Sequence, residues 1–346
     1  MIESLEKVSC NLCGSADCTE LQIGLKMDEE EIQAFGLDTP SWVLCNNCSL
    51  LYQSPRLTQA MWGKYYQQSF YREVQSKKEI EPGYITYSYV QFQKVEDWLK
   101  SNGIVISGSF PKSYLDYGCG IGGTLKYLRD KGCRSVDGIE VDPFLIGEGK
   151  RIFDVEISKG FEDPRISLKK FDLIFTHHCL EHVLDLNEFF NKSRHSLEDG
   201  GYLVIVVPSY KYGTIKFDYG TSIAHNFILT HHTLGNYLRK HGLVYVNYCY
   251  RKVKRGFDNE LWCIARKSEA VDGNSISFDP EVVKAELFEI MHAMPKRIMF
   301  WTIPDYLMVH GRRLLGSVAS RLLPATVMDA LRKGRRAKSN LADDRK

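Results

Sequence analysis

The fold is decided by a short stretch that reads Leu115-Asp116-Tyr117-Gly118-Cys119-Gly120-Ile121-Gly122-Gly123. A strand pattern over residues 113–117 leads into it, and a helix pattern over residues 124–131 follows. Glycines at 118, 120 and 122 let the backbone turn tightly and approach a ligand without Cβ clashes. A strand, a glycine loop and a helix in this order predict the nucleoside-binding edge of an α/β domain.

The glycine spacing alone does not determine which nucleoside-containing ligand the loop binds. Counted from Gly118, the residues Gly120 and Gly123 complete the G-x-G-x-x-G spacing of dinucleotide-binding loops, so NAD is one alternative. Asp116, two residues before the first glycine, distinguishes the alternatives. Its carboxylate would repel a pyrophosphate but could hold a cationic or amino group.

Strand-like and helix-like segments alternate on both sides of this loop. Helix patterns cover residues 124–131, 144–153, 186–197 and 233–241. Strand patterns cover residues 113–117, 135–140, 155–159, 171–176, 202–207, 243–250 and 261–266. Alternation at this pitch predicts a seven-stranded, Rossmann-like, doubly wound α/β sheet.

The chain divides into four regions by composition. Residues 1–70 hold five of the ten cysteines, and we expect a small metal-stapled module there. Residues 71–110 carry aromatic residues near helical spacing, which predicts a helical connector or lid ending at Asn102-Gly103. Residues 111–267 form the alternating domain, and residues 268–346 are expected to be a helical, basic extension.

Two cysteine knuckles stand in the first region. They are Cys10-x2-Cys13 and Cys45-x2-Cys48, and 31 residues separate them. Each pair can offer two thiolates to one tetrahedral ion, so the four predict a closed structural site for Zn²⁺. A rubredoxin-like iron is the alternative, because the same geometry serves it. Cys18 could substitute for a ligand but lies outside both knuckles.

The composition indicates the cellular location that we expect for the protein. Apolar residues make up 44% of the chain, and the net charge is only +2. No apolar run approaches the roughly 18 residues of a membrane span. Residues 1–6 are acidic and do not resemble a secretory signal. Ten cysteines in such a chain favour metal binding over disulfides, so we expect a cytoplasmic protein.

The glycine loop and the segments after it resemble the class I S-adenosylmethionine (SAM) dependent methyltransferases. The first family motif is similar to residues 115–122. Later motifs are similar to Asp137-Gly138-Ile139-Glu140-Val141-Asp142-Pro143, Gly160-Phe161-Glu162, Phe171-Asp172-Leu173-Ile174-Phe175, Leu180-Glu181-His182-Val183 and the turn over residues 197–203.

This resemblance implies SAM as the cofactor and methyl transfer as the reaction. Glu140 matches the acid that binds the ribose hydroxyls, although aspartate is commoner there, and Phe161-Glu162 match the segment beside the adenine. The implied cofactor-binding residues are Asp116, Gly118, Gly120, Gly122, Glu140, Phe161, Glu162 and His177.

The cysteine module followed by the methyltransferase motifs resembles methyltransferases that act on deoxysugars and cell-surface polysaccharides. The acceptor implied is a sugar or nucleotide-sugar hydroxyl. The sugar C-methyltransferases have a further α/β domain after the core, whereas about 80 residues follow Lys267 here, which favours O-methylation. C-methylation of a deoxysugar and methylation of a lipid-linked or other small natural product are the alternatives.

Histidines gather where the acceptor of a methyl group would bind. The carboxyl end of the fourth strand leads into His177-His178-Cys179-Leu180-Glu181-His182, and residues 224–232 hold three more histidines. His182 beside Glu181 and His225 are the candidate proton acceptors. In ubiquinone-pathway O-methyltransferases a Glu-x-x-Glu-His segment resembles a divalent-metal site, but His178 replaces its first glutamate here.

The last region differs in charge. Between residues 296 and 338 there are ten basic and two acidic residues, a net charge of +8. Apolar residues such as Phe300, Trp301 and Leu307 alternate with the arginines. Such a segment could lie on an anionic inner membrane surface, or it could dock on the core or on another subunit.

A non-catalytic zinc-ribbon module that binds nucleic acid is the remote alternative. Residues 1–70 contain four basic residues against nine acidic ones. A surface that tracks phosphates needs a basic stripe. We therefore expect no nucleic-acid partner.

Overall fold

The computed structural model describes residues 5–21, 41–67, 80–107, 110–209, 223–251 and 259–268, with single positions at 282 and 285. The expected helical extension with its basic, amphipathic tail lies outside these residues. In the described part, no helix has both the length and the apolar character needed to cross a bilayer.

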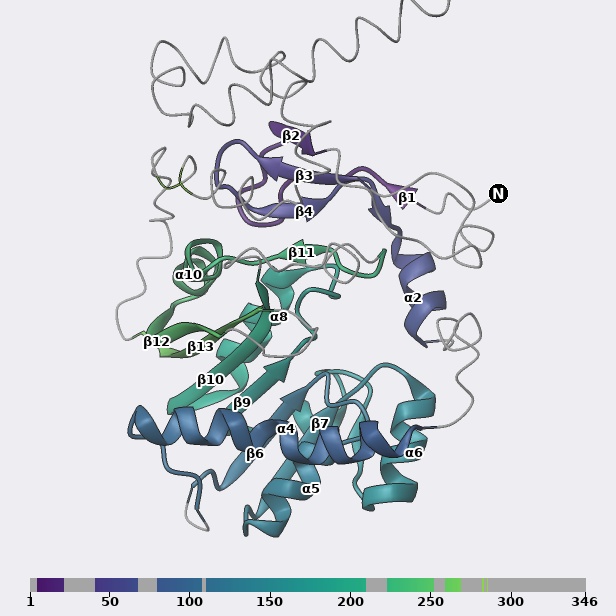
Figure 1. Cartoon of the computed structure of the whole chain (residues 1–346), viewed down its shortest axis with the longest axis vertical. Helices are drawn as coiled ribbons and strands as arrows, with labels where there is room; N and C mark the ends of the chain where they lie inside the picture. The colour runs from purple at the N-terminus through teal and green to yellow at the C-terminus, as the bar shows by residue number, and fades with distance from the viewer. Residues whose placement is uncertain are drawn as a thin grey trace, which may run out of the picture.

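Seven strands of the described residues form one large sheet (Figure 1), which confirms the predicted α/β fold. The sheet order is β12-β13-β10-β9-β6-β7-β8, and only β13 runs antiparallel to its neighbours. The strands are β6 (Ser113–Tyr117), β7 (Ser135–Ile139), β8 (Ile157–Ser158), β9 (Phe171–His177), β10 (Leu197–Ser209), β12 (Leu243–Arg251) and β13 (Asn259–Lys267).

Strand β10 is longer than the apolar run that predicts it. It begins at Leu197, and the pairing register with β9 shifts between Leu197 and Tyr202. Gly201 lies in this irregular stretch, where a Cβ would stand 2.9 Å from the Phe171 carbonyl oxygen. The strand also continues through Pro208, which stands opposite Glu260 of β13. The strand therefore extends beyond both ends of the predicted range 202–207, with an irregular register at its start.

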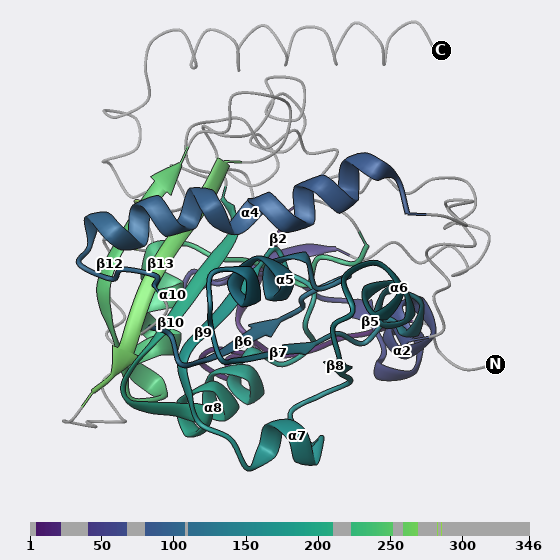
Figure 2. The same ribbon diagram turned by 90° about the horizontal axis from the view of Figure 1, so that it is seen from below.

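Helices cover both faces of the sheet, and the alternation of side chains along β10 assigns the faces. Leu203 and Ile205 point to the face covered by α8 (Leu186–Ser196) and α10 (His231–Lys240). Val204 and Val206 point to the face covered by α4 (Pro82–Ser101) and α5 (Gly123–Asp130). Figure 2 shows α4 and α8 on opposite sides of the strands.

The helix ends follow local capping chemistry. Helix α4 ends before Asn102 as predicted, with the Asn102 amide donating to the Leu99 carbonyl and the Gly103 amide donating to the Lys100 carbonyl. Helix α10 starts two residues earlier than its apolar pattern, because the Thr230 and Thr233 hydroxyls form a reciprocal capping box. Helix α6 (Pro143–Phe153) starts at Asp142, whose side chain accepts from the Phe144 amide.

The cysteine region forms a small sheet that also includes a strand of the alternating domain. Strand β11 (Phe227–Ile228) pairs with β4 (Leu51–Gln53), so that Phe227 faces Tyr52 and Ile228 faces Leu51. The sheet order is β11-β4-β3-β2, with β3 (Trp42–Cys45) and β2 (Cys18–Leu21), and Figure 1 shows this small sheet at one end of the large one. In the same region β1 (Leu5–Glu6) and β5 (Arg56–Leu57) pair separately, and the helix α2 (Gln59–Gln67) follows.

One apolar core runs through both parts. Leu50 and Tyr52 of the small sheet belong to the same buried cluster as Phe190 of α8 and Tyr237 of α10. The cysteine region is thus joined to the alternating domain by a shared core as well as by shared strand pairing.

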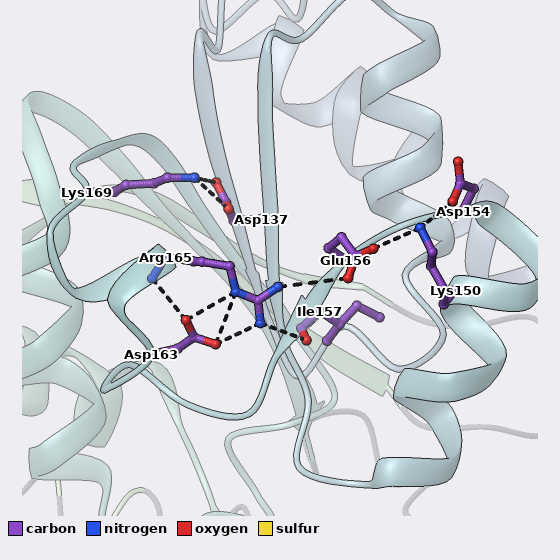
Figure 3. A network of polar contacts seen from close by, with 8 residues as sticks. All are labelled: Asp137, Lys150, Asp154, Glu156, Ile157, Asp163, Arg165 and Lys169. Carbon is purple, nitrogen blue, oxygen red and sulfur yellow. Dashed lines mark hydrogen bonds and ion pairs between the residues drawn. The ribbon is translucent and has the colours of Figure 1, made fainter.

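The β8 edge of the large sheet carries a surface ion-pair network (Figure 3). Lys150 pairs with Asp154 at 2.6 Å and with Glu156 at 2.8 Å. Arg165, after the start of α7 (Pro164–Ser167), forks onto Asp163 and approaches Glu156 at 4.0 Å. Exposed pairs of this kind contribute little stability, but charged groups along a sheet edge discourage edge-to-edge pairing.

Candidate functional site

A pocket of about 360 Å³ lies at the carboxyl ends of β6, β7 and β9. This is the edge where open α/β sheets bind their ligands. Its floor consists of the glycine loop and the residues after β7, and its walls come from α2, α4 and the loop after β9. The lining residues are Trp62, Tyr66, Tyr84, Tyr87, Ser88, Gln91, Tyr117, Gly118, Cys119, Gly120, Ile139, Glu140, Val141, Asp142, Leu145, His177, His178, Cys179, His182 and Val183.

The glycine loop has the conformation that its sequence predicts. Gly118, Gly120 and Gly122 have φ values of 80°, 56° and 74°. A Cβ at Gly118 would lie 2.4 Å from Cys179 Sγ, and one at Gly120 would lie 2.7 Å from the Tyr84 hydroxyl. Gly118 and Gly120 line the pocket, whereas Gly122 caps the start of α5 behind it.

Glu140 joins the loops after β6 and β7. Its Oε2 accepts from the Gly120 amide at 3.0 Å, and its Oε1 accepts from the Val141 and Asp142 amides at 2.7 and 3.0 Å. Burial raises the pKa of this carboxyl, while the three amides oppose the rise. Each carboxylate oxygen can accept more than one hydrogen bond, so Glu140 can also receive ligand hydroxyls.

Asp116 lies behind the glycine loop instead of in the pocket wall. It is 1% exposed, and burial together with the nearby Glu140 raises its pKa to about 8. Its Oδ2 has no hydrogen-bond partner among the described residues. A cation bound nearby favours the ionised form of a buried carboxyl such as Asp116 and of Glu140, which lines the pocket. The pair therefore fits a cationic ligand such as SAM in the adjoining pocket.

Besides Asp116 and Gly122, two further implied cofactor residues do not line the pocket. Phe161 stacks on the Tyr117 ring at 5.4 Å and belongs to the core beneath α8. Glu162 is largely exposed and forms an ion pair with Lys192. The sequence motif located this turn, but it did not show which way its side chains point.

The end of β9 brings two histidines to a carboxylate that the sequence analysis missed. Glu260 Oε1 lies 3.1 Å from His178 Nε2 and 4.0 Å from His177 Nε2, and Trp262 Nε1 donates to Oε2 at 2.7 Å. Burial lowers the pKa of His177 to about 3, so this ring is neutral. Glu260 reaches this edge because β13 runs antiparallel, which an apolar strand pattern does not reveal.

Glu181, His182 and His225, the candidate catalytic residues from the sequence, lie together in the structure. The centroids of the His182 and His225 rings lie 4.5 Å apart, and His182 Nε2 lies 3.8 Å from Glu181 Oε1. Glu181 is 3% exposed, and its Oε2 has no hydrogen-bond partner in the described part of the chain. Burial lowers the pKa of His182, although Glu181 opposes the shift. Of the three, only His182 lines the pocket.

Aromatic residues of α2 and α4 complete the pocket, and the sequence analysis did not assign them to it. Trp62 and Tyr66 come from α2, and Tyr84 and Tyr87 come from α4. The aromatic spacing of residues 84–99 predicts the helix, but only the docked structure shows that its first turns face the ligand.

The four knuckle cysteines converge as predicted. Cys10 Sγ lies 3.4 Å from Cys48 Sγ, Cys13 Sγ lies 3.5 Å from Cys45 Sγ, and all four sulfurs lie within 4.8 Å of one another. A tetrahedral ion with bonds of about 2.3 Å needs sulfurs close to these separations. The hydrogen bond with Cys10 raises the pKa of Cys48, because crowded thiols resist ionising together without a cation. Cys18 is not in this group.

The fold and the site thus define a class of protein: an α/β domain with a ligand-sized pocket at its glycine loop and an attached four-cysteine module. Residues 92–248 are similar to the family model described as a methyltransferase domain.

Relatives with assigned activities match parts of the chain. Ajmaline N-methyltransferase of Rauvolfia serpentina is 29% identical over 107 residues, which are 28% of this chain and 36% of that enzyme. The chloroplastic tocopherol O-methyltransferase of Arabidopsis thaliana is 25% identical over 163 residues, which are 43% of this chain and 45% of that enzyme. The chain therefore spans less than half the length of these relatives.

Among solved structures, magnesium protoporphyrin IX methyltransferase from Synechocystis with bound S-adenosylhomocysteine is similar. The match has 13% identity and a TM-score of 0.42, and it covers 60% of this chain and 99% of that one. The N-methyltransferase NodS from Bradyrhizobium japonicum matches with 18% identity and a TM-score of 0.39, over 55% of this chain and 99% of that one.

The glycine loop makes a prediction about stability. In Gly118→Ala, the new methyl group would overlap Cys179 in a backbone conformation that alanine disfavours. We expect the free energy of unfolding to fall by about 2–4 kcal/mol, measured by urea denaturation. Gly147→Ala is the control, because no atom lies within 4 Å of its Cβ in α6. Equal stability of the two variants would contradict the close packing of the loop.

Proposed function

We propose that this protein is a SAM-dependent methyltransferase that acts on a small-molecule acceptor. The observation that carries the proposal is the glycine loop with Glu140 and the buried Asp116, at the strand ends of a matched methyltransferase domain. SAM would supply an electrophilic methyl group on a positively charged sulfur.

Within this proposal, the floor of the pocket holds the cofactor. Gly118 and Gly120 expose backbone that a ligand can approach closely, and Glu140 accepts the ribose hydroxyls. The buried carboxyl groups of Asp116 and Glu140 make the surroundings favourable for a cation. The loop after β9 then faces the acceptor.

His182 is the proton acceptor that we propose for the acceptor hydroxyl. Methyl transfer from an oxygen nucleophile requires that its proton leaves, and a positioned base typically accelerates such a step about 10²–10⁴-fold. His182 lines the pocket, and its lowered pKa keeps the ring neutral near pH 7. His225 and Glu181 stand behind it, so they act through His182.

The acceptor that we propose is a sugar or nucleotide-sugar hydroxyl, on the basis of the cysteine module and its resemblance to sugar methyltransferases. A phenol or an amine is the alternative, since the partial relatives are named for ajmaline N-methylation and tocopherol O-methylation. The aromatic wall formed by Trp62, Tyr66, Tyr84 and Tyr87 suits either a sugar face or an aromatic ring. The cytoplasmic location is likewise a proposal, supported by the thiol-rich sequence.

We also propose that the four cysteines hold one zinc ion. Four thiolates complete a tetrahedral shell, so the ion would stabilise the fold and would offer no position to substrate. The site also belongs to the shared core, since Cys10, Cys45 and Cys48 are buried in the cluster that contains Tyr237.

Loss of the Glu140 carboxylate is expected to weaken cofactor binding. Glu140→Ala removes acceptors for the ribose hydroxyls, each worth about 1.5–3 kcal/mol when charged, so the SAM Kd should rise tenfold or more by calorimetry. Glu156→Ala, at an exposed ion pair, is the control and should leave the Kd unchanged. Unchanged SAM affinity in Glu140→Ala, or tight NAD binding by the parent protein, would sink the cofactor proposal.

The metal proposal predicts one zinc ion per chain by elemental analysis of freshly purified protein. Cys45→Ser should lose the metal and lower the Tm by about 5 °C or more, because binding of the ion is coupled to folding. Cys18→Ser should keep its zinc, since Cys18 lies outside the cluster. A metal-free parent protein, or a Cys45→Ser variant with full zinc content, would be the contrary result.

The role of His182 as proton acceptor is tested by measuring S-adenosylhomocysteine formation with a panel of nucleotide sugars, phenols and amines as acceptors. His182→Ala should lower kcat about 10²–10⁴-fold with little change in SAM affinity. The parent kcat should rise with pH along a limb below the usual histidine pKa of about 6.5, because burial lowers the pKa of His182. His195→Ala, on α8 away from the pocket, serves as control. If kcat of His182→Ala stays within a few-fold of the parent, the base assignment is wrong.

A further inference from the structure

The backbone of the loop that carries His182 is held largely from the cysteine region. Trp62 Nε1, on α2, donates to the His182 carbonyl at 2.8 Å. Arg56 Nη1, on β5, donates to the Leu184 carbonyl at 2.5 Å. Both donors are more than a hundred residues from the carbonyls in sequence, so these contacts form only across the docked parts.

A second set of contacts passes through the strand pairing. Asn226 lies next to β11, and its side chain donates to the His182 and Val183 carbonyls at 2.9 and 3.1 Å. The backbone amide of Asn226 donates to the Glu181 carbonyl at 2.6 Å. Asn226 is itself fixed because its carbonyl accepts from the Gln53 amide of β4 at 3.0 Å. Residues that neighbour the histidine on both sides are thus tied to the small sheet.

The first cysteine knuckle makes the third connection. Asn11 follows Cys10 within the first knuckle, and its Nδ2 donates to Asp185 Oδ1 at 2.9 Å. Its carbonyl accepts from Asn187 Nδ2 at 2.6 Å, and its Oδ1 accepts from the Tyr237 hydroxyl at 2.8 Å. Asp185 caps α8, so the knuckle is bonded directly to the end of the His182 loop.

The His182 ring is oriented in the same way. Its Nδ1 lies 2.8 Å from the Tyr66 hydroxyl of α2 and 3.2 Å from the Ala224 carbonyl. A carbonyl can only accept, so Nδ1 carries the proton and Nε2 presents its lone pair. Nε2 lies 3.8 Å from Glu181 Oε1, beyond hydrogen-bond distance.

We propose that the cysteine module positions the proton acceptor of the reaction, with Tyr66 holding the His182 ring and Asn11 tying its loop to the thiol cluster. This inference rests on the proposed function. Tyr66 and Asn11 act through His182 and are positioning residues. The module thereby has a second role besides stability, because disturbing the knuckle disturbs the acceptor side of the pocket and leaves the glycine loop intact.

The titration of His182 reports the arrangement without a known acceptor. Charged or titratable groups that face the ring are Glu181 of its own loop, His178 after β9, His225 before β11 and Tyr66 of α2. Protein labelled with ¹⁵N-histidine gives the tautomer and pKa of His182 by NMR, with His182→Gln used to assign its signals. The parent protein should show the Nδ1-protonated tautomer.

Tyr66→Phe removes only the hydroxyl and keeps the ring packing. We expect it to move the His182 pKa by about half a unit or more, and to reduce kcat about tenfold on any acceptor found active. Tyr89→Phe is the matched control, because the Tyr89 hydroxyl bonds Asp130 away from the pocket. An unchanged His182 titration in Tyr66→Phe would overturn the role of Tyr66.

Asn11→Ala tests the link to the knuckle and retains all four thiols. Its zinc content should equal that of the parent, while the His182 signals shift and amide exchange of residues 181–185 becomes faster. Parent-like signals and exchange in this variant would overturn the coupling. Calorimetric measurement of SAM affinity distinguishes this proposal from the proposed function. If the parent protein does not bind SAM, the proposed function is refuted, whereas the His182 measurements still test the positioning by the cysteine module.

Discussion

The carboxylate of Glu140, which accepts from three backbone amides, is the interaction on which the pocket depends. It draws the loop after β6 and the loop after β7 together, and the floor of the pocket is what lies between them. The same group lies near the buried Asp116, and burial together with Glu140 raises the pKa of Asp116 to about 8. A cation bound in the pocket would favour the ionised forms of both carboxyl groups, which links the geometry of the loop to the cationic cofactor that we propose.

The second organising feature is the shared edge between the small and large sheets. A two-residue strand such as β11 has little stability by itself, and β4 gives it a pairing partner. The loop after β9 depends on the same contact through Asn226. The pocket therefore has two halves with different support: the glycine loop is held within the α/β domain, and the histidine loop is held from the cysteine region.

Local sequence predicted the structure correctly wherever the residues that determine a feature are neighbours in the chain. The glycine loop, all seven strands of the large sheet and the cysteine cluster were predicted, because turn residues, apolar periodicity and ligand spacing are short-range patterns. Trp62 and Tyr66 were missed because they reach the pocket on a docked helix, and Glu260 because an antiparallel register brings it to the pocket residue His178. Phe161 and Glu162 were located correctly in the chain, but the packing of Phe161 on Tyr117 turns them away from the pocket.

The common core of the two regions has a consequence for how the protein responds to its surroundings. An ion that binds the thiol cluster only in the folded state adds RT ln(1 + [L]/Kd) to the free energy of unfolding, which is about 1.4 kcal/mol for each tenfold excess. Because Leu50 and Tyr52 lie in one cluster with Phe190 and Tyr237, that energy is shared by the α/β domain. If the cluster holds the zinc ion that we propose, the fraction of folded protein would follow the metal supply of the cell.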